Sequence, residues 1–137
     1  MRDIVVDTNI LFSALLGKSK KLRDFLLSSK DFAFYTCKFV VVELFKYKEK
    51  IQQKSLLEEE EILELLYELL KKINIFDENA ITYESLKNAY ALCKDVDKKD
   101  TPFVAVTIEI NGLLWTNDKK LTNGLKSKGF DSFFEFD

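Results

Sequence analysis

The sequence contains no histidine among its 137 residues. This absence excludes the Ser-His-Asp and Cys-His nucleophile systems, and also the histidine acid–base pairs of metal-free ribonucleases. It excludes nearly every zinc site as well, because two distant cysteines, Cys37 and Cys93, cannot complete a set of four ligands. Any catalysis therefore has to rest on carboxylates, lysines, hydroxyls or a hard metal ion.

The chain also lacks a long apolar run. No stretch approaches the roughly 18 apolar residues of a membrane span, and the first residues, which include Asp3, do not form the apolar core of a signal peptide. We expect the two cysteines to be reduced thiols in the core, and the protein to be cytoplasmic with no membrane partner. The net charge of −2 gives no overall basic field for nucleic acid, so local groups of lysines matter more than the total.

One proline and four glycines leave few breaks between regular elements. Strands are predicted at 3–6, 31–35, 74–76, 113–116 and 131–136. Helices are predicted at 8–16, from a cap at Ser19 through Leu26, and at 36–50, 55–72, 82–94, 101–110 and 118–128. Their alternation predicts parallel crossover connections. The expected fold class is α/β, with a single domain over residues 1–137. It would be a three-layer α/β/α sandwich with a central parallel sheet of about five strands.

Two helix predictions depend on competing signals. The stretch from Thr36 to about Lys50 contains three consecutive valines, which also suit a strand. A helix is favoured because its polar residues do not alternate with period two, and Thr36 would be its N-cap. Ser55 begins the clearest helix, in which leucines and an isoleucine form one apolar stripe as far as Lys72.

Four acidic residues map to the carboxyl ends of the predicted strands, where open parallel sheets bind ligands. Asp7 ends the first strand, Asp118 follows the fourth by two residues, and Asp100 opens the helix that leads into the fourth strand. Glu43 lies in the helix after the second strand, among apolar residues where an unpaired charge is destabilising. An oxygen-only ligand set favours Mg²⁺ or Mn²⁺.

Each acid also has a purely structural interpretation. Asp7 and Asp118 can be N-caps of the helices that follow them, and Asp100 can supplement a cap at Thr101. A salt bridge to a lysine would satisfy Glu43 as well as a bound cation would. The convergence of the four residues, rather than any one of them, favours a metal site at which an activated water attacks a phosphodiester.

Four segments resemble the motifs of the PIN-domain family, which includes the VapC-like toxins. They are Val5–Leu11, Val42–Leu44, Asp97–Ala105 and Leu114–Leu121, and their order and spacing match along essentially the whole chain. The resemblance implies a Mg²⁺- or Mn²⁺-dependent endoribonuclease that hydrolyses RNA, and specifically the toxin of a toxin–antitoxin pair. The implied partners are an RNA substrate, an antitoxin protein and a second copy of the chain.

The resemblance also assigns roles to residues. It makes Asp7, Glu43, Asp100 and Asp118 the catalytic, metal-binding acids, with Asp97 as a fifth acid beside them and Asn9 and Thr116 as supporting hydrogen-bonding residues. Lysines are the expected RNA contacts: Lys119 and Lys120 first, and Lys18, Lys20, Lys21 with Arg23 as weaker candidates.

Two alternatives remain beside the nuclease. One is a non-catalytic or weakly catalytic PIN module that binds RNA or a protein partner. The other is a different phosphate-handling α/β enzyme, such as an aspartate-nucleophile phosphatase, which requires a second aspartate where this chain has Asn9.

Overall fold

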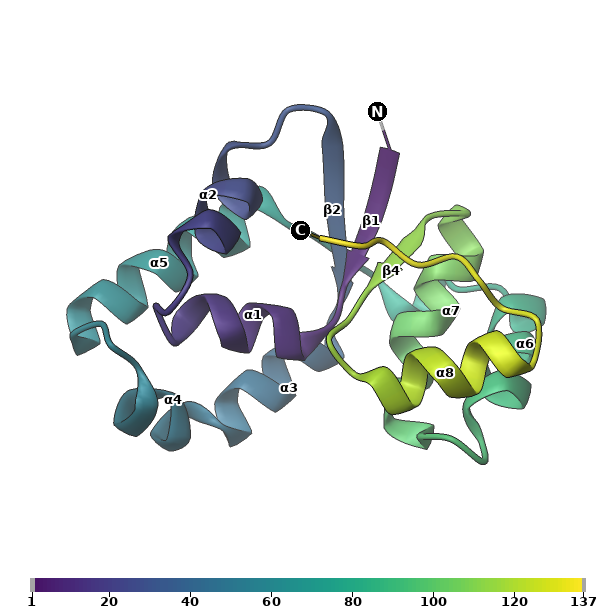
Figure 1. Cartoon of the computed structure of the whole chain (residues 1–137). Helices are drawn as coiled ribbons and strands as arrows, with labels where there is room; N and C mark the ends of the chain where they lie inside the picture. The colour runs from purple at the N-terminus through teal and green to yellow at the C-terminus, as the bar shows by residue number, and fades with distance from the viewer. Residues whose placement is uncertain (1, 137) are drawn as a thin grey trace.

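The computed structural model describes residues 2–136. Its four strands, all parallel, form one sheet in the order β3-β2-β1-β4. The strands are β1 (Arg2–Val6), β2 (Phe32–Cys37), β3 (Asn74–Phe76) and β4 (Leu113–Trp115). Figure 1 shows this sheet between two groups of helices, which confirms the predicted three-layer α/β/α arrangement.

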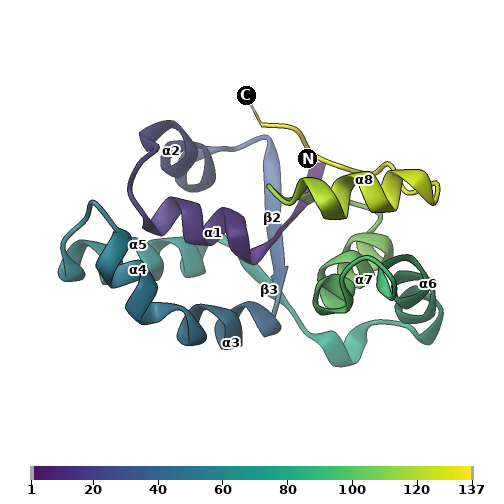
Figure 2. The same ribbon diagram turned by 60° about the horizontal axis from the view of Figure 1, so that its bottom comes forward.

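The helices form two groups, one on each side of the sheet, as the second view also shows (Figure 2). The first layer contains α1 (Thr8–Leu15), α2 (Lys20–Ser28), α3 (Phe39–Lys46), α4 (Lys48–Lys54) and α5 (Glu59–Lys72). The second contains α6 (Tyr83–Cys93), α7 (Thr101–Ile110) and α8 (Lys119–Ser127), with the short 3₁₀ turns η1 (Glu78–Ala80) and η2 (Lys98–Asp100) leading into α6 and α7.

The core lies on both faces of the central strand β1. Ile4, Val5 and Val6 are fully buried, as expected for a parallel strand that helices cover on both sides. On one face α7 packs against β1, β2 and β4 through the buried run from Phe103 to Val106. Because α7 is apolar on nearly all sides, its N-terminal turn, which contains Asp100, is fixed against the sheet.

Three predicted element boundaries are wrong. Thr36 does not cap a helix: it lies inside β2, and its hydroxyl donates to the carbonyl of Val6 at 2.9 Å. The predicted helix 36–50 is two helices, α3 and α4, that meet at Tyr47. Ser55 lies before α5 rather than in it, because its hydroxyl donates to Leu15 O, and Glu58 caps α5 through a capping box with Glu61.

The sheet has four strands among the described residues, not five. The predicted strand at 131–136 contributes only one parallel bridge, between Leu114 and Phe133. The predicted helix ends at Gly17 and Gly129 are confirmed, since both glycines have positive φ angles of 73° and 93°. Cys37 and Cys93 are buried free thiols, as predicted. No helix within residues 2–136 is long and apolar enough to cross a membrane.

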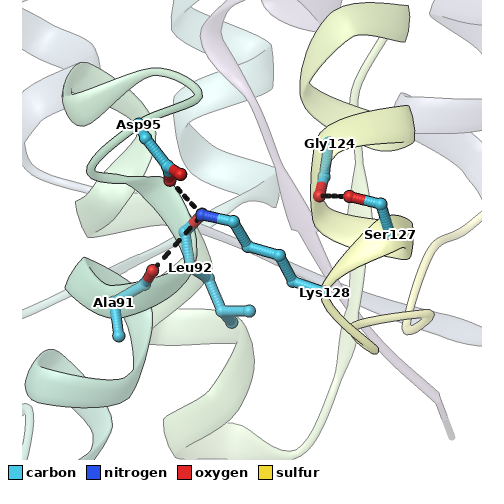
Figure 3. A network of polar contacts seen from close by, with 6 residues as sticks. All are labelled: Ala91, Leu92, Asp95, Gly124, Ser127 and Lys128. Carbon is cyan, nitrogen blue, oxygen red and sulfur yellow. Dashed lines mark hydrogen bonds and ion pairs between the residues drawn. The ribbon is translucent and has the colours of Figure 1, made fainter.

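Two contacts hold α8 against the end of α6. Lys128, just after α8, donates to the carbonyl oxygens of Leu92 at 2.9 Å and Ala91 at 3.4 Å, and it pairs with Asp95 (Figure 3). A cationic donor at a helix C-terminus satisfies carbonyls that have no partner within the helix. Gly124 allows a close approach on the same side, because an added Cβ would lie 2.8 Å from Val96 Cγ1. The segment before η2 is therefore fixed relative to the C-terminal half of α8.

Candidate metal centre

Asp7 is the most firmly held acid of the site. It is 4% exposed, at the carboxyl end of β1, and its Oδ1 accepts from Thr8 N at 2.7 Å. Its Oδ2 accepts from Thr116 Oγ1 at 2.7 Å and from Asn9 Nδ2 at 3.2 Å. Asp7 is thus the N-cap of α1, as the structural interpretation predicted, and a carboxylate of the pocket described below. The two interpretations are compatible because a carboxylate has about four acceptor sites.

The two predicted supporting residues join β1 to β4. Asn9 Nδ2 also donates to Thr116 Oγ1 at 3.2 Å, and Asn9 Oδ1 accepts from Asn117 N at 3.1 Å. Thr116 Oγ1 accepts in turn from Asp118 N at 3.1 Å. Asn9 and Thr116 therefore bind Asp7 to the loop that carries Asp118.

Glu43 reaches the same region from α3. Its Oε1 accepts from Thr8 Oγ1 at 2.6 Å, so a hydroxyl rather than a lysine satisfies it. Other apolar residues of α3 are open to solvent, since Val42 is 58% exposed and Phe45 is 70% exposed. Glu43 is only partly buried, and it lies on the face of α3 that is turned toward α1.

Asp97, Asp100 and Asp118 form a tighter group on the other side. One carboxylate oxygen from each lies within 4.8 Å of the others. Asp97 Oδ1 accepts from Lys99 N at 3.0 Å in the η2 turn, and Asp118 Oδ1 accepts from Leu121 N at 3.1 Å as the N-cap of α8. Within residues 2–136 no hydrogen bond to the Asp100 carboxylate is found. Asp97, ranked fifth among the acids from the sequence alone, belongs to this group of three.

These five acids line one pocket of about 330 Å³, which we call the acidic pocket. Phe12, Tyr47, Lys50 and Lys99 complete much of its wall. Lys119 and Lys120 are exposed and do not line it, so RNA contact by them stays a prediction. Sequence reasoning missed Thr8, Lys50 and Lys99. Lys99 lies between Asp97 and Asp100, which was a usable signal, whereas only the fold brings Lys50 to the pocket.

Crowding of carboxylates changes their pKa values. Burial raises the pKa of Asp7 from 3.8 to about 6, although hydrogen bonds from Thr116 and Thr8 oppose the shift. Burial also raises the pKa of Asp100 to about 8, and the negative charges of Asp7, Asp97, Asp118 and Glu43 add to this effect. Asp100 is therefore the acid for which the site most lacks a compensating positive charge.

Comparison with known proteins identifies the family. The sequence model described as PIN domain matches residues 5–134 of this chain. This chain belongs to the PIN-domain family. A similar solved structure is the crystal structure of VapBC2 from Rickettsia felis bound to a DNA fragment from their promoter. The two chains are 21% identical, the match covers 88% of this chain and 92% of that chain, and the TM-score is 0.62, which is a likeness of fold. The search of curated proteins found no match.

The donor set of this PIN domain fits a hard divalent cation. All five acids offer oxygen ligands, and the sequence has no histidine to favour a softer metal. Within residues 2–136 neither Lys50 nor Lys99 forms an ion pair with these acids. When ionised, three carboxylates within 4.8 Å without such a partner repel each other, and a cation among them offsets that repulsion.

Proposed function

We propose that this PIN domain is a Mg²⁺- or Mn²⁺-dependent endoribonuclease. The observation that carries the proposal is the convergence of five carboxylates in one pocket, three of them within 4.8 Å of one another. Four of the five come from the carboxyl-end loops of β1 and β4 and the turn before α7, and Glu43 comes from α3. Family membership agrees with this chemistry, because the resemblance implies a nuclease.

Asp97, Asp100 and Asp118 would hold the cation, with Asp7 and Glu43 facing it across the pocket. When bound, a divalent cation supplies charge stabilisation for a phosphodiester and lowers the pKa of a nearby water. Asp7 is kept in one orientation by Thr116, Asn9 and Thr8, so that its position does not depend on the ligand. Fixed carboxylates of this kind contribute by preorganisation, since they need no rearrangement during the reaction.

Lys50 and Lys99 would reduce the electrostatic repulsion between a polyanion and this acidic site. Both are exposed lysines in its wall. A phosphate near the pocket meets five carboxylates, and two ammonium groups at the rim offset part of their repulsion. The lysines thereby favour the phosphate backbone of RNA over a neutral substrate.

A test of the nuclease uses labelled single-stranded RNA with Mn²⁺, with Mg²⁺ and with EDTA. The wild type should cut only with a cation, and Asp7→Asn and Asp118→Asn should lose at least about 100-fold in rate. Asp31→Asn is the matched control, because this exposed aspartate lies at the amino end of β2, away from the pocket. If the wild type binds RNA but cuts nothing with either cation, the non-catalytic PIN module is the better account.

We further propose that the chain is the toxin of a toxin–antitoxin pair. Its fold is similar to that of VapBC2, and α3 exposes an apolar row formed by Val41, Val42 and Phe45. An antitoxin segment could cover this row and inhibit the nuclease. Coexpression with a small DNA-binding protein from an adjacent gene tests the pair: Phe45→Glu should weaken copurification, and Tyr83→Glu, an equally exposed aromatic on α6, should not. The expected homodimer stays a prediction that the molar mass in solution tests.

A further inference from the structure

A second pocket, of about 340 Å³, adjoins the acidic pocket. Its wall contains four aromatic rings, from Trp115 at the end of β4 and from Phe133, Phe134 and Phe136 in the C-terminal segment. We call it the aromatic pocket. The mechanism above uses none of these rings, although they lie beside the loop that carries Asp118.

The two pockets share one wall. Asn117 lines the aromatic pocket and the next residue, Asp118, lines the acidic pocket. Consecutive Cα atoms are about 3.8 Å apart, so the two pockets meet at the loop after β4, although no residue lines both. The wall is rigid, because Asn9 Oδ1 accepts from Asn117 N at 3.1 Å and Thr122 Oγ1 donates to Asp118 O at 3.0 Å.

The rings form a packed group with one open side. Trp115 is 2% exposed and its ring centroid lies 5.2 Å from that of Phe134 and 5.3 Å from that of Phe136. The three phenylalanines of the C-terminal segment are only partly buried, so part of each remains accessible. A planar group can stack on such rings, which suits a nucleobase because every base has a π face.

The rim of the aromatic pocket carries one charge of each sign, from the exposed residues Lys126 and Glu135. Lys126 is exposed, lines the pocket, and its Nζ lies 5.7 Å from the ring centroid of Phe133. Lys21 Nζ lies 5.3 Å from the ring centroid of Phe136. Lys126 beside the ring of Phe133 can contact a phosphate, and Asn117 adds an exposed amide that can hydrogen-bond a base edge.

From these contacts we infer that the aromatic pocket binds a nucleobase of the single-stranded RNA, next to the phosphodiester held in the acidic pocket. This inference rests on the proposed function for the identity of the substrate. It makes Phe133, Asn117 and Lys126 determinants of RNA position and base preference. A base seated there would fix which phosphodiester reaches the acids.

The single tryptophan of the chain reports on this pocket directly. The experiment titrates the full-length protein in EDTA with a short single-stranded RNA while the emission of Trp115 is recorded, so that binding is measured without cleavage. A matched RNA whose central nucleotides lack bases keeps the phosphates and removes the stacking group. We expect saturable quenching by the first RNA, and affinity at least about tenfold weaker for the second.

Variants separate a base site from ordinary core packing. Phe133→Leu should weaken quenching about tenfold. Asn117→Ala should also weaken quenching, and this substitution is at an exposed residue and keeps the backbone hydrogen bond from Asn117 N to Asn9. Lys126→Ala should reduce the salt dependence of binding, and Lys87→Ala, an exposed lysine on α6, should change nothing. Equal affinity for the two RNAs, or unchanged quenching in both Phe133→Leu and Asn117→Ala, would overturn the inference.

Failure of the base site and failure of the proposed nuclease give different results in these experiments. Cleavage with Mn²⁺ by a protein whose Trp115 emission does not respond to RNA would reject the base site and leave the nuclease standing. Saturable, base-dependent quenching without cleavage under any cation would support the base site and reject the nuclease.

Discussion

Asp7 and Asp100 lie in the same pocket but are held in opposite ways. Asp7 accepts three hydrogen bonds, from Thr8, Asn9 and Thr116, while the structure places no such donor on Asp100 within residues 2–136. The pKa of Asp7 accordingly rises only to about 6 despite its deep burial, whereas that of Asp100 rises to about 8 beside four other acids. One half of the site is stabilised by the protein itself, and the other half needs a ligand of opposite charge.

The largest effect should come from removing the acid that lacks partners. Asp100→Asn keeps the shape of the side chain but removes its negative charge from the group with Asp97 and Asp118. We expect RNA cleavage with Mn²⁺ to fall by more than about 100-fold, because the cation loses a ligand. Cleavage assays at saturating RNA measure this, and circular dichroism should show an unchanged fold. Wild-type activity in this variant would show that the cation lies elsewhere.

A smaller loss of cleavage is expected when a hydrogen-bond donor to Asp7 is removed. Thr116→Val removes the hydroxyl that donates to Asp7 at 2.7 Å and accepts from Asp118 N. Loss of such an orienting partner should reduce Mn²⁺ affinity and cleavage about 10- to 100-fold. The measurement is the Mn²⁺ concentration for half-maximal cleavage. Thr107→Val, which loses a bond to Phe103 O inside α7, away from the acidic pocket, is the control for removal of a hydroxyl.

Substitution of Lys128 tests how firmly the end of α8 is held against α6, near the group formed by Asp97, Asp100 and Asp118. Lys128→Met removes the donor to the carbonyls of Ala91 and Leu92 at the end of α6 while retaining most of the aliphatic length. We expect the free energy of unfolding to fall by about 1 kcal/mol in urea titrations. Lys87→Met, on the exposed face of the same helix, should lie within about 0.5 kcal/mol of the wild type. A comparable loss in both variants would exclude a specific role for the α6–α8 contact.

The smallest effect is a difference in pH dependence without metal. A carboxyl whose pKa is higher in the folded state than its unfolded value of 3.8 stabilises the protein below that value, and this contribution is lost as pH rises through the folded pKa. In EDTA, stability should therefore decline from about pH 4 to about 8, by less than about 1 kcal/mol per pH unit after solvent screening.

Asp7 and Asp100 titrate in different pH ranges, so their contributions to the pH dependence of stability can be distinguished. Asp100→Asn should remove the decline well above pH 6, where Asp7 is mostly ionised. Asp7→Asn should keep a decline at high pH but shift it to lower pH, because the charge of Asp7 is one cause of the raised pKa of Asp100. Urea midpoints measured across the pH range decide between them. An identical decline in wild type and Asp100→Asn would contradict the raised pKa of Asp100.

The meeting of the acids could be predicted from the sequence because it follows from topology. Asp7 and Asp118 come directly after parallel strands, and the carboxyl ends of such strands share one edge of the sheet. The position of Asp97 could not be predicted in the same way. Its carboxylate approaches Asp100 and Asp118 only because η2 turns the chain back and Gly124 lets α8 lie close to Val96.

Other misses have equally local causes. Thr36 has the chemistry of an N-cap, but the hydrogen bond to Val6 O that keeps it in β2 is a contact across 30 residues. The helix predicted through the three valines is confirmed as α3, although it ends at Lys46 and not at Lys50. Propensity and periodicity specify local structure, and such tertiary contacts override them.

Calorimetric titration of Mn²⁺ into the metal-free protein at neutral pH tests the central claim most directly. The wild type should bind Mn²⁺ saturably and release protons, because Asp100, with a pKa of about 8, must lose its proton to become a ligand. Asp100→Asn should bind at least about tenfold more weakly and release fewer protons. Absence of Mn²⁺ binding by the wild type, or equal binding by the variant, would contradict the assignment of this pocket as a metal centre.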